Sequence, residues 1–378
     1  MHIIAAIDSF KGSCSTIEAA RAVARGIAKI DPTVQVTIVP IADGGDGTCL
    51  ALSEGLSGVL HHKLVRGPLG ESIDAVFAVL PDGTGVVELA AASGLTLLTE
   101  DSRNPMRTST FGTGQLIAAA LDEGCRKLII GLGGSATNDG GTGLARALGI
   151  QFYDEFGRLL PEGGGSLADL HHIDTSGLDR RLAASEVIIA CDVNNPLCGP
   201  QGASAVFGPQ KGASPLEVTQ LDSALFHYAS ILKTQLGIDL ATLPGAGAAG
   251  GAAMAFMAFC NGRIQRGIDV MLDLADFDTL LQTADLVITG EGRIDSQTVF
   301  GKVPVGVAAR AKQKQVPVIA ITGCIAEGAE AVYEQGIDAM LSIADGPISL
   351  EYSMQHAEAL IEATAERILR LLQIGKSF

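Results

Sequence analysis

A glycine-rich segment over residues 131–143 has the composition of a phosphate-binding turn. It interleaves six glycines with Ser, Thr and Asn. Backbone N–H groups and short polar side chains in such a turn can surround an anion. The candidate ligands for phosphate are Gly133, Gly134, Ser135, Thr137 and Asn138. The segment matches neither GxxxxGK[ST] nor GxGxxG, so it is neither a P-loop nor a dinucleotide fingerprint.

Carboxylates in two other segments could serve a metal ion or a proton transfer. Asp43 and Asp46 are separated by two glycines, and their hard oxygens suit Mg²⁺. The alternative is a turn in which Asp46 caps a helix. Asp192 follows the apolar run 187–191 and is a candidate general base or metal ligand.

Cations and further carboxylates stand in three more segments. Asp8, Ser9 and Lys11 follow the first apolar run, just before an expected helix N-terminus that suits an anion. Lys211 lies in a Gly-Pro loop and suits a phosphate or carboxylate partner, or is an ordinary exposed lysine. In the segment 290–295, Arg293 could bind a carboxylate with two hydrogen bonds, or it could form an ion pair with Asp295. The two acids of this segment are Glu291 and Asp295.

Most of these segments follow a short apolar run of the kind that forms a buried parallel strand. Such runs are predicted at 2–7, 34–39, 286–289, 316–321 and 339–343. Ser15 and Glu18 fit a capping box for a helix that ends at Asp31-Pro32. Further helices are predicted at 304–312, at about 326–335 and from residue 349 nearly to the end. Two strand–helix units at the start and three at the end predict one five-stranded sheet with helices on both faces.

The middle of the chain predicts a second domain. Residues 64–89 alternate β-rich runs with turns, and two strong strands at 128–132 and 187–191 lead into polar loops. The expected fold is therefore α/β: a discontinuous, doubly wound Rossmann- or flavodoxin-like domain over 1–64 and 285–378, with an α/β domain inserted over 65–284. Ligands bind beyond the carboxyl ends of strands in such folds, so we expect the active site in the cleft between the two domains.

Composition limits the partners. The chain has 378 residues and a formal net charge of −16, which disfavours nucleic acid as a partner. Its seven cysteines form no CxxC pair, which favours a reducing, cytoplasmic location. We find no targeting signal and no apolar run long enough for a membrane span, and a homodimer is left open.

The sequence resembles the glycerate kinase type I family along essentially its whole length. The segments that carry the resemblance are DSFKG (8–12), ADGGDGT (42–48), NPMRTSTFGTG (104–114), GGSATNDGG (133–141), CDVNNPL (191–197), VFGPQKG (206–212), PGAGAAGG (244–251) and TGEGRIDSQT (289–298). One such segment alone is weak evidence, whereas eight in order are specific.

The resemblance implies an ATP- and Mg²⁺-dependent kinase for D-glycerate. Under it, Asp192, Lys11 and Arg293 are the expected catalytic residues, with Asp192 accepting the hydroxyl proton. The expected glycerate ligands are Asp8, Ser9, Glu291 and Asp295. The expected ligands of the nucleotide phosphates are Gly133, Gly134, Ser135, Thr137, Asn138 and Lys211. The expected Mg²⁺ ligands are Asp43 and Asp46. The product is 2-phosphoglycerate or, less favoured, 3-phosphoglycerate. The alternatives are a kinase for another hydroxy or sugar acid and a non-catalytic sensor of such an acid.

Overall fold

The computed structural model describes residues 1–41, 47–300 and 302–375. The chain folds into two compact units. The first unit comprises Met1–Asp43, Glu54–Leu56 and Gly267–Phe378, and the second comprises Gly44–Ser53 and Ser57–Arg266. This division departs from the predicted boundaries at 64 and 285. Residues 57–64 belong to the second unit, because the strand that begins at Val59 pairs in the second sheet. Residues 267–284 belong to the first unit.

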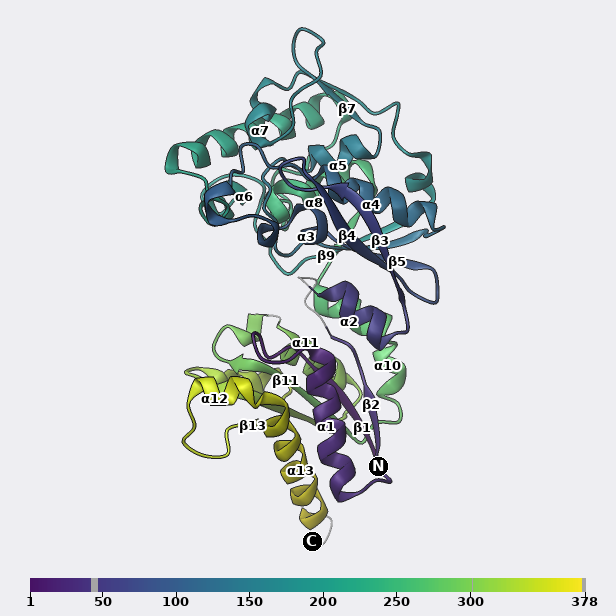
Figure 1. Cartoon of the computed structure of the whole chain (residues 1–378), viewed down its shortest axis with the longest axis vertical. Helices are drawn as coiled ribbons and strands as arrows, with labels where there is room; N and C mark the ends of the chain where they lie inside the picture. The colour runs from purple at the N-terminus through teal and green to yellow at the C-terminus, as the bar shows by residue number, and fades with distance from the viewer. Residues whose placement is uncertain (42–46, 301, 376–378) are drawn as a thin grey trace. The chain divides into compact units, whose positions relative to one another are not determined.

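The first unit contains a five-stranded, wholly parallel sheet (Figure 1). Its spatial order is β13-β12-β11-β1-β2. The strands are β1 (His2–Ile7), β2 (Gln35–Ile38), β11 (Leu286–Ile294), β12 (Val318–Ile325) and β13 (Ala339–Ser342). The prediction of one sheet built from both ends of the chain is confirmed.

Helices bury both faces of this sheet. Alternate residues of a strand point to opposite faces, so Ile4 and Ala6 join the core under α9 and α11, while Ile3 and Ala5 join the core under α1 and α13. This double burial explains why β1 is a continuous apolar run. The helices are α1 (Thr16–Ile30), α9 (Gly267–Leu274), α10 (Phe277–Leu280), α11 (Val303–Gln313), α12 (Leu350–Gln355) and α13 (Ala357–Gly375).

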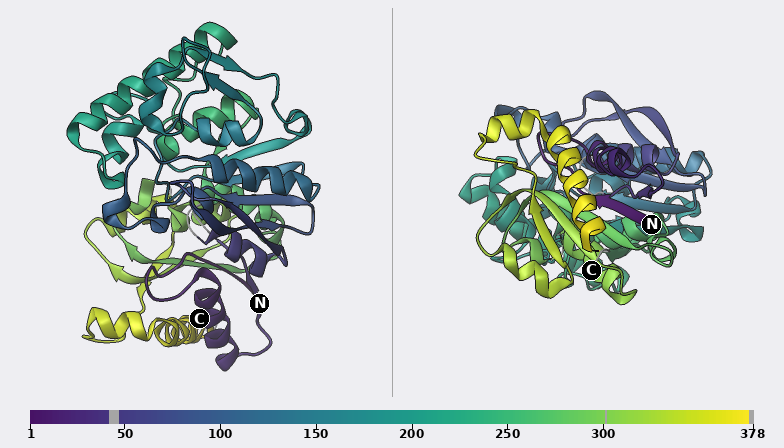
Figure 2. Two further views of the ribbon diagram at one scale, coloured as in Figure 1. Left: turned by 45° about the horizontal axis from the view of Figure 1, so that its top comes forward. Right: turned by 90° about the horizontal axis from the view of Figure 1, so that it is seen from below.

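Helices α1 and α13 pack side by side, as both views of Figure 2 show. Gly26 permits this close approach, because a Cβ added there would overlap the carbonyl oxygen of Glu362. The predicted capping box of α1 is present: Ser15 accepts from the N–H of Glu18, and the Glu18 carboxylate accepts from the N–H of Ser15.

Two predicted helices of the first unit differ from the structure. The segment predicted as a helix over about 326–335 is a 3-10 helix, Ala329–Gln335, between the left-handed residues Gly328 and Gly336. The helix predicted after Ser349 is interrupted at His356, which ends α12 with non-helical backbone angles before α13 begins.

The second unit contains a six-stranded mixed sheet in the order β10-β9-β6-β5-β4-β3. Strands β5, β6, β9 and β10 run parallel, and β3 and β4 form an antiparallel edge. The strands are β3 (Val59–Arg66), β4 (Ser72–Val79), β5 (Thr84–Glu88), β6 (Lys127–Gly131), β9 (Glu186–Ala190) and β10 (Arg263–Gln265); β7 (Gln151–Tyr153) and β8 (His172–Asp174) form a separate pair.

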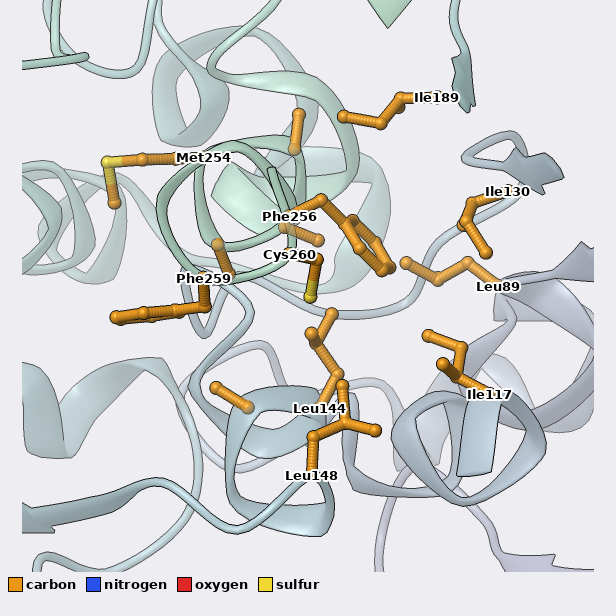
Figure 3. Packing of buried hydrophobic residues seen from close by; sticks show 14 of the residues in the cluster. Leu89, Ile117, Ile130, Leu144, Leu148, Ile189, Met254, Phe256, Phe259 and Cys260 are labelled. Atoms are coloured by element: carbon orange, nitrogen blue, oxygen red, sulfur yellow. The ribbon is translucent and has the colours of Figure 1, made fainter. Parts of the chain in front are cut away.

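One large core fills the second unit. Figure 3 shows Phe256 facing Leu89, with Ile117 and Ile130 nearby, so helices and strands interlock through apolar side chains. The helices of this unit are α3 (Ala90–Ser93), α4 (Phe111–Asp122), α5 (Thr142–Ala147), α6 (Ala203–Phe207), α7 (Pro215–Leu236) and α8 (Ala248–Phe259). Helix α2 (Thr48–Gly55) is divided between the units. No helix in the described part of the chain is long and apolar enough to cross a membrane.

Candidate active site

The glycine-rich turn follows β6 at the carboxyl edge of the second sheet. Gly133 and Gly134 are exposed, and Ser135 is 8% exposed. Gly134 has φ +69°, a left-handed conformation that glycine adopts without strain. The carbonyl oxygen of Gly134 accepts from the N–H of Leu95 at 2.8 Å. The turn is therefore held in place while its tip stays open.

Thr137 and Asn138 lie inside the unit instead. Both side chains are fully buried. The Asn138 amide donates to the Ser204 hydroxyl at 3.0 Å, and within the described residues Thr137 Oγ1 and Asn138 Oδ1 have no hydrogen-bond partner. Of the five predicted phosphate ligands in this segment, only Gly133, Gly134 and Ser135 lie where an outside ligand could meet them.

Lys211 lies beneath the same turn. Its side chain is buried, with 2% of the residue exposed, and its ammonium donates to Ser135 Oγ and to the carbonyl oxygen of Thr137, both at 2.7 Å. Burial lowers the pKa of Lys211 to about 7, and the nearby carboxylate of Asp139 opposes that shift. The sequence left two roles open for Lys211: a ligand for phosphate or carboxylate, or an ordinary exposed lysine. A buried ammonium is neither exposed nor directly accessible to a ligand.

Asp139, which sequence reasoning passed over, joins two helix N-termini. Its carboxylate accepts from the N–H and the hydroxyl of Thr110, both at 2.8 Å, and from the N–H groups of Gly141 and Gly143 at 3.0 and 3.2 Å. These donors stand at the starts of α4 and α5, where free N–H groups favour a negative charge. Burial raises the pKa of Asp139, while its hydrogen bonds oppose the shift.

Asp192 stands close to the glycine-rich turn. Ala190 of β9 pairs with Gly131 of β6, so Asp192 and Gly133 each lie two residues beyond paired positions of neighbouring parallel strands. The Asp192 side chain is exposed. The prediction that each segment follows a strand is confirmed, and the pairing of β6 with β9 brings the two segments to one sheet edge.

Glu88 is a further acid at this edge, and the sequence analysis missed it. It ends β5, pairs with Gly131 and is buried. Its carboxylate accepts from the N–H groups of Gly47 and Cys49 at 3.1 and 2.5 Å, at the start of α2. The sequence signal for Glu88 is a single acidic residue at the end of the apolar run 84–88.

The predicted magnesium ligands Asp43 and Asp46 lie outside the described residues.

The remaining candidates gather at the carboxyl edge of the first sheet. Ile7 of β1 pairs with Gly290 of β11, so the segments after these two residues are neighbours. The N–H of Asp8 donates to the Gly290 carbonyl oxygen at 2.9 Å, and Asp8 Oδ1 accepts from the N–H of Ser9 at 2.7 Å. Lys11 is exposed.

Strand β11 extends further than predicted and carries the other charged residues. It ends at Ile294 rather than near 289 because Arg293 still pairs with β12. The exposed Arg293 forms an ion pair with Asp295, Nε to Oδ2 at 3.2 Å, and a hydrogen bond from the N–H of Gln297 is the largest of several effects that lower the pKa of Asp295.

Glu291 faces inward from the same strand. It is 7% exposed; Oε1 accepts from the Thr298 hydroxyl at 2.7 Å, and Oε2 lies 3.5 Å from the Lys302 ammonium. Burial raises the pKa of Glu291, and its bonds to Thr298 and Lys302 oppose the shift. Lys302 was not among the predicted site residues. It lies at the start of α11, where it forms this ion pair with Glu291.

Each unit therefore presents one polar sheet edge. The first edge carries Asp8, Ser9, Lys11, Glu291, Arg293 and Asp295, and the second carries Glu88, Gly133, Gly134, Ser135 and Asp192, with Lys211 beneath. Parallel α/β sheets with a glycine turn and cations at their carboxyl ends are typical of proteins that bind anionic ligands, phosphates among them.

Comparison with known proteins names the family. The family model described as the glycerate kinase family matches residues 3–373. The chain is 49% identical to the glycerate kinase of Bacillus subtilis, covering 100% of this chain and 99% of that one. It is 45% identical to the glycerate 2-kinase of Escherichia coli, covering 99% of each. A crystal structure of a presumed glycerate kinase 2 from Salmonella typhimurium LT2 matches all of both chains with a TM-score of 0.92 and 44% identity. The chain belongs to the glycerate kinase family.

Proposed function

We propose that this protein transfers the γ-phosphoryl group of ATP to a hydroxyl of D-glycerate. Full-length membership in the family supports the reaction, and the name of the Escherichia coli relative supports the 2-hydroxyl as acceptor. The structural observation that carries the proposal is the turn Gly133-Gly134-Ser135, with its two exposed glycines, on the strand next to that of Asp192. Phosphoryl transfer needs donors for phosphate and an acceptor for the hydroxyl proton.

The polar edges of the two units are assigned different ligands. The second unit's turn would hold the nucleotide phosphates, and Asp192 would take the proton of the attacking hydroxyl. Asp8, Ser9 and Asp295 would bind glycerate, with Lys11 and Arg293 neutralising its carboxylate or the transferred group. Because Glu291 is buried against Thr298 and Lys302, its proposed contribution is to position Lys302.

The finer fold assignment also belongs to this proposal. Renumbered within the first unit, its strands have the order 2-1-3-4-5, that of flavodoxin-like doubly wound sheets. We assign that fold to the first unit, with the second as an inserted α/β domain. The cytoplasmic location and the homodimer stay predictions.

Mg²⁺ is assigned to Asp43 and Asp46. In the described part of the chain no three His, Cys, Asp or Glu side chains form a metal-binding group. Mg²⁺ in kinases is commonly held by one or two carboxylates and the phosphates themselves, so a pair of Asp residues fits. When bound, the ion would neutralise phosphate charge.

The role of Asp192 is tested by Asp192→Asn. The amide keeps the shape but accepts a proton poorly, so we expect kcat to fall by roughly 10²–10⁴-fold while the dissociation constants of ATP and D-glycerate stay near wild type. Asp169→Asn, an exposed acid of the same unit, is the matched control. Near-normal turnover of folded Asp192→Asn would discard this role.

The competing functions are separated by the substrate. Turnover of ATP is compared without acid, with D-glycerate, and with a panel of other hydroxy and sugar acids. A kinase for another acid would turn over a panel member with a higher kcat/KM than D-glycerate. A sensor would bind an acid and release no ADP with any of them.

A further inference from the structure

The turn Gly133-Gly134-Ser135 offers an unfilled set of backbone donors. Its three successive N–H groups donate to no residue that the structure describes. The two glycines are exposed, and the left-handed Gly134 sits at the centre of the turn. Successive N–H groups in such a turn form a concave site for an anion.

Lys211 approaches this turn from the interior. Its two hydrogen bonds fix the hydroxyl of the third turn residue, Ser135, and the carbonyl oxygen of Thr137 just beyond it. The surrounding chain excludes water from the ammonium, since only 2% of the residue is exposed. A phosphate on the open side of the turn would therefore meet the N–H groups, with the ammonium behind them.

The burial of Lys211 is hard to explain by stability alone. Removing an ammonium from water costs several kcal/mol, and the two oxygens to which Lys211 donates, Ser135 Oγ and the Thr137 carbonyl oxygen, are uncharged. Among the groups packed around Lys211, the Asp139 carboxylate favours the charged form of the lysine. That carboxylate, however, already accepts four hydrogen bonds from Thr110, Gly141 and Gly143. A cation in a water-poor interior does, however, act strongly on a nearby anion.

We propose that Lys211 is a positioning residue of the nucleotide site, which fixes Ser135 and places a positive charge behind the turn without touching the phosphate. This inference rests on the proposed kinase function and deepens it. It replaces the sequence expectation that Lys211 binds phosphate directly.

A double-mutant cycle on ATP binding tests the inference. The dissociation constant is measured by calorimetry for wild type, Ser135→Ala, Lys211→Met and the double variant, and KM and kcat are measured beside it. Because a hydrogen bond to a charged group is involved, Lys211→Met should weaken ATP binding by about 10-fold or more. The effect should be much smaller in the Ser135→Ala background, because the two residues act through one contact. KM for D-glycerate should not change.

Several results would overturn the positioning role. Additive effects of the two substitutions would mean that Lys211 acts on the nucleotide independently of Ser135, as a direct ligand would. A folded Lys211→Met variant with wild-type affinity would remove any role. The control is Lys233→Met, an exposed lysine of α7 in the same unit, which should leave all constants unchanged. If wild type neither binds ATP nor forms phosphoglycerate, the kinase proposal fails, and the inference fails with it.

A second measurement uses only the wild-type protein, so it tests the inference even if Lys211→Met does not fold. At about pH 8, a lysine with a pKa of about 7 is mostly neutral, and a bound polyanion favours its charged form. Wild type should then take up more than about half a proton on binding ATP, as measured by calorimetry in two buffers with different ionisation enthalpies. Binding without proton uptake would contradict a buried Lys211 that senses the phosphate.

Discussion

Individual polar residues of the second unit hold the chain next to the glycine-rich turn through hydrogen bonds made inside the protein. Asp139 shows this most clearly, because one buried carboxylate satisfies N–H groups at the starts of both α4 and α5. Without it, Thr110, Gly141 and Gly143 would each keep a buried donor without its acceptor. Unsatisfied buried donors cost far more than an exposed hydrogen bond gains.

Asp139→Ala should therefore destabilise the protein strongly. We expect a loss of about 3 kcal/mol or more in the free energy of unfolding, measured by urea denaturation, because three buried N–H groups lose their acceptor. Asp174→Ala is the control, since that carboxylate accepts from one N–H, of Ser176, in a more exposed position; it should unfold near the wild-type midpoint. A comparable midpoint for both variants would refute the central role of Asp139.

At the scale of elements, serine side chains cap the starts of α1, α7 and α12. Helix α7 starts with Ser214, whose hydroxyl accepts from the N–H of Glu217 while the Glu217 carboxylate accepts from the N–H of Ser214. Pro215 at the first helical position adds a backbone angle suited to a helix. This start fixes the long helix that packs Leu221, Leu225 and Tyr228 into the core.

Ser214→Ala should lower the free energy of unfolding by about 1 kcal/mol, the usual cost of losing an N-cap. The control lies in the same helix: among the described residues, the Ser230 hydroxyl donates to the carbonyl oxygen of Phe226 one turn earlier and to no other group. Ser230→Ala should be neutral or slightly stabilising because Ala favours helix. Both are measured by thermal and urea unfolding. Equal losses from the two substitutions would show that the cap contributes nothing special.

Much of the element pattern could be predicted from the sequence. The apolar run of β1 and the capping box of α1 are local signals, and both are present in the structure. The extension of β11 to Ile294 was missed because pairing with β12 depends on the folded chain. The break at His356 was missed because no glycine or proline marks it in the local sequence.

The site could be predicted only as a set of segments. Sequence order indicates that Asp192 and the glycine turn follow strands, and pairing of those strands brings them to one edge. It does not reveal which side chains turn inward. Thr137, Asn138 and Lys211 have the composition of surface ligands, yet tertiary packing buries all three.

At the scale of the whole molecule, a chain of net charge −16 is proposed to bind two anions. Salt screens the global charge over about 8–10 Å, so nearby groups dominate at each site. Lys11, Arg293 and Lys302 at one edge, and the turn over Lys211 at the other, supply local positive potential. In the proposed reaction, one edge binds glycerate and the other binds the nucleotide phosphates.

The central claim is tested by analysing the product formed from ATP, Mg²⁺ and D-glycerate. Phosphorus NMR, with authentic standards, resolves phosphate on the 2-hydroxyl from phosphate on the 3-hydroxyl. We predict stoichiometric ADP and 2-phosphoglycerate. The absence of any phosphoglycerate, from folded protein that binds D-glycerate, would contradict the account.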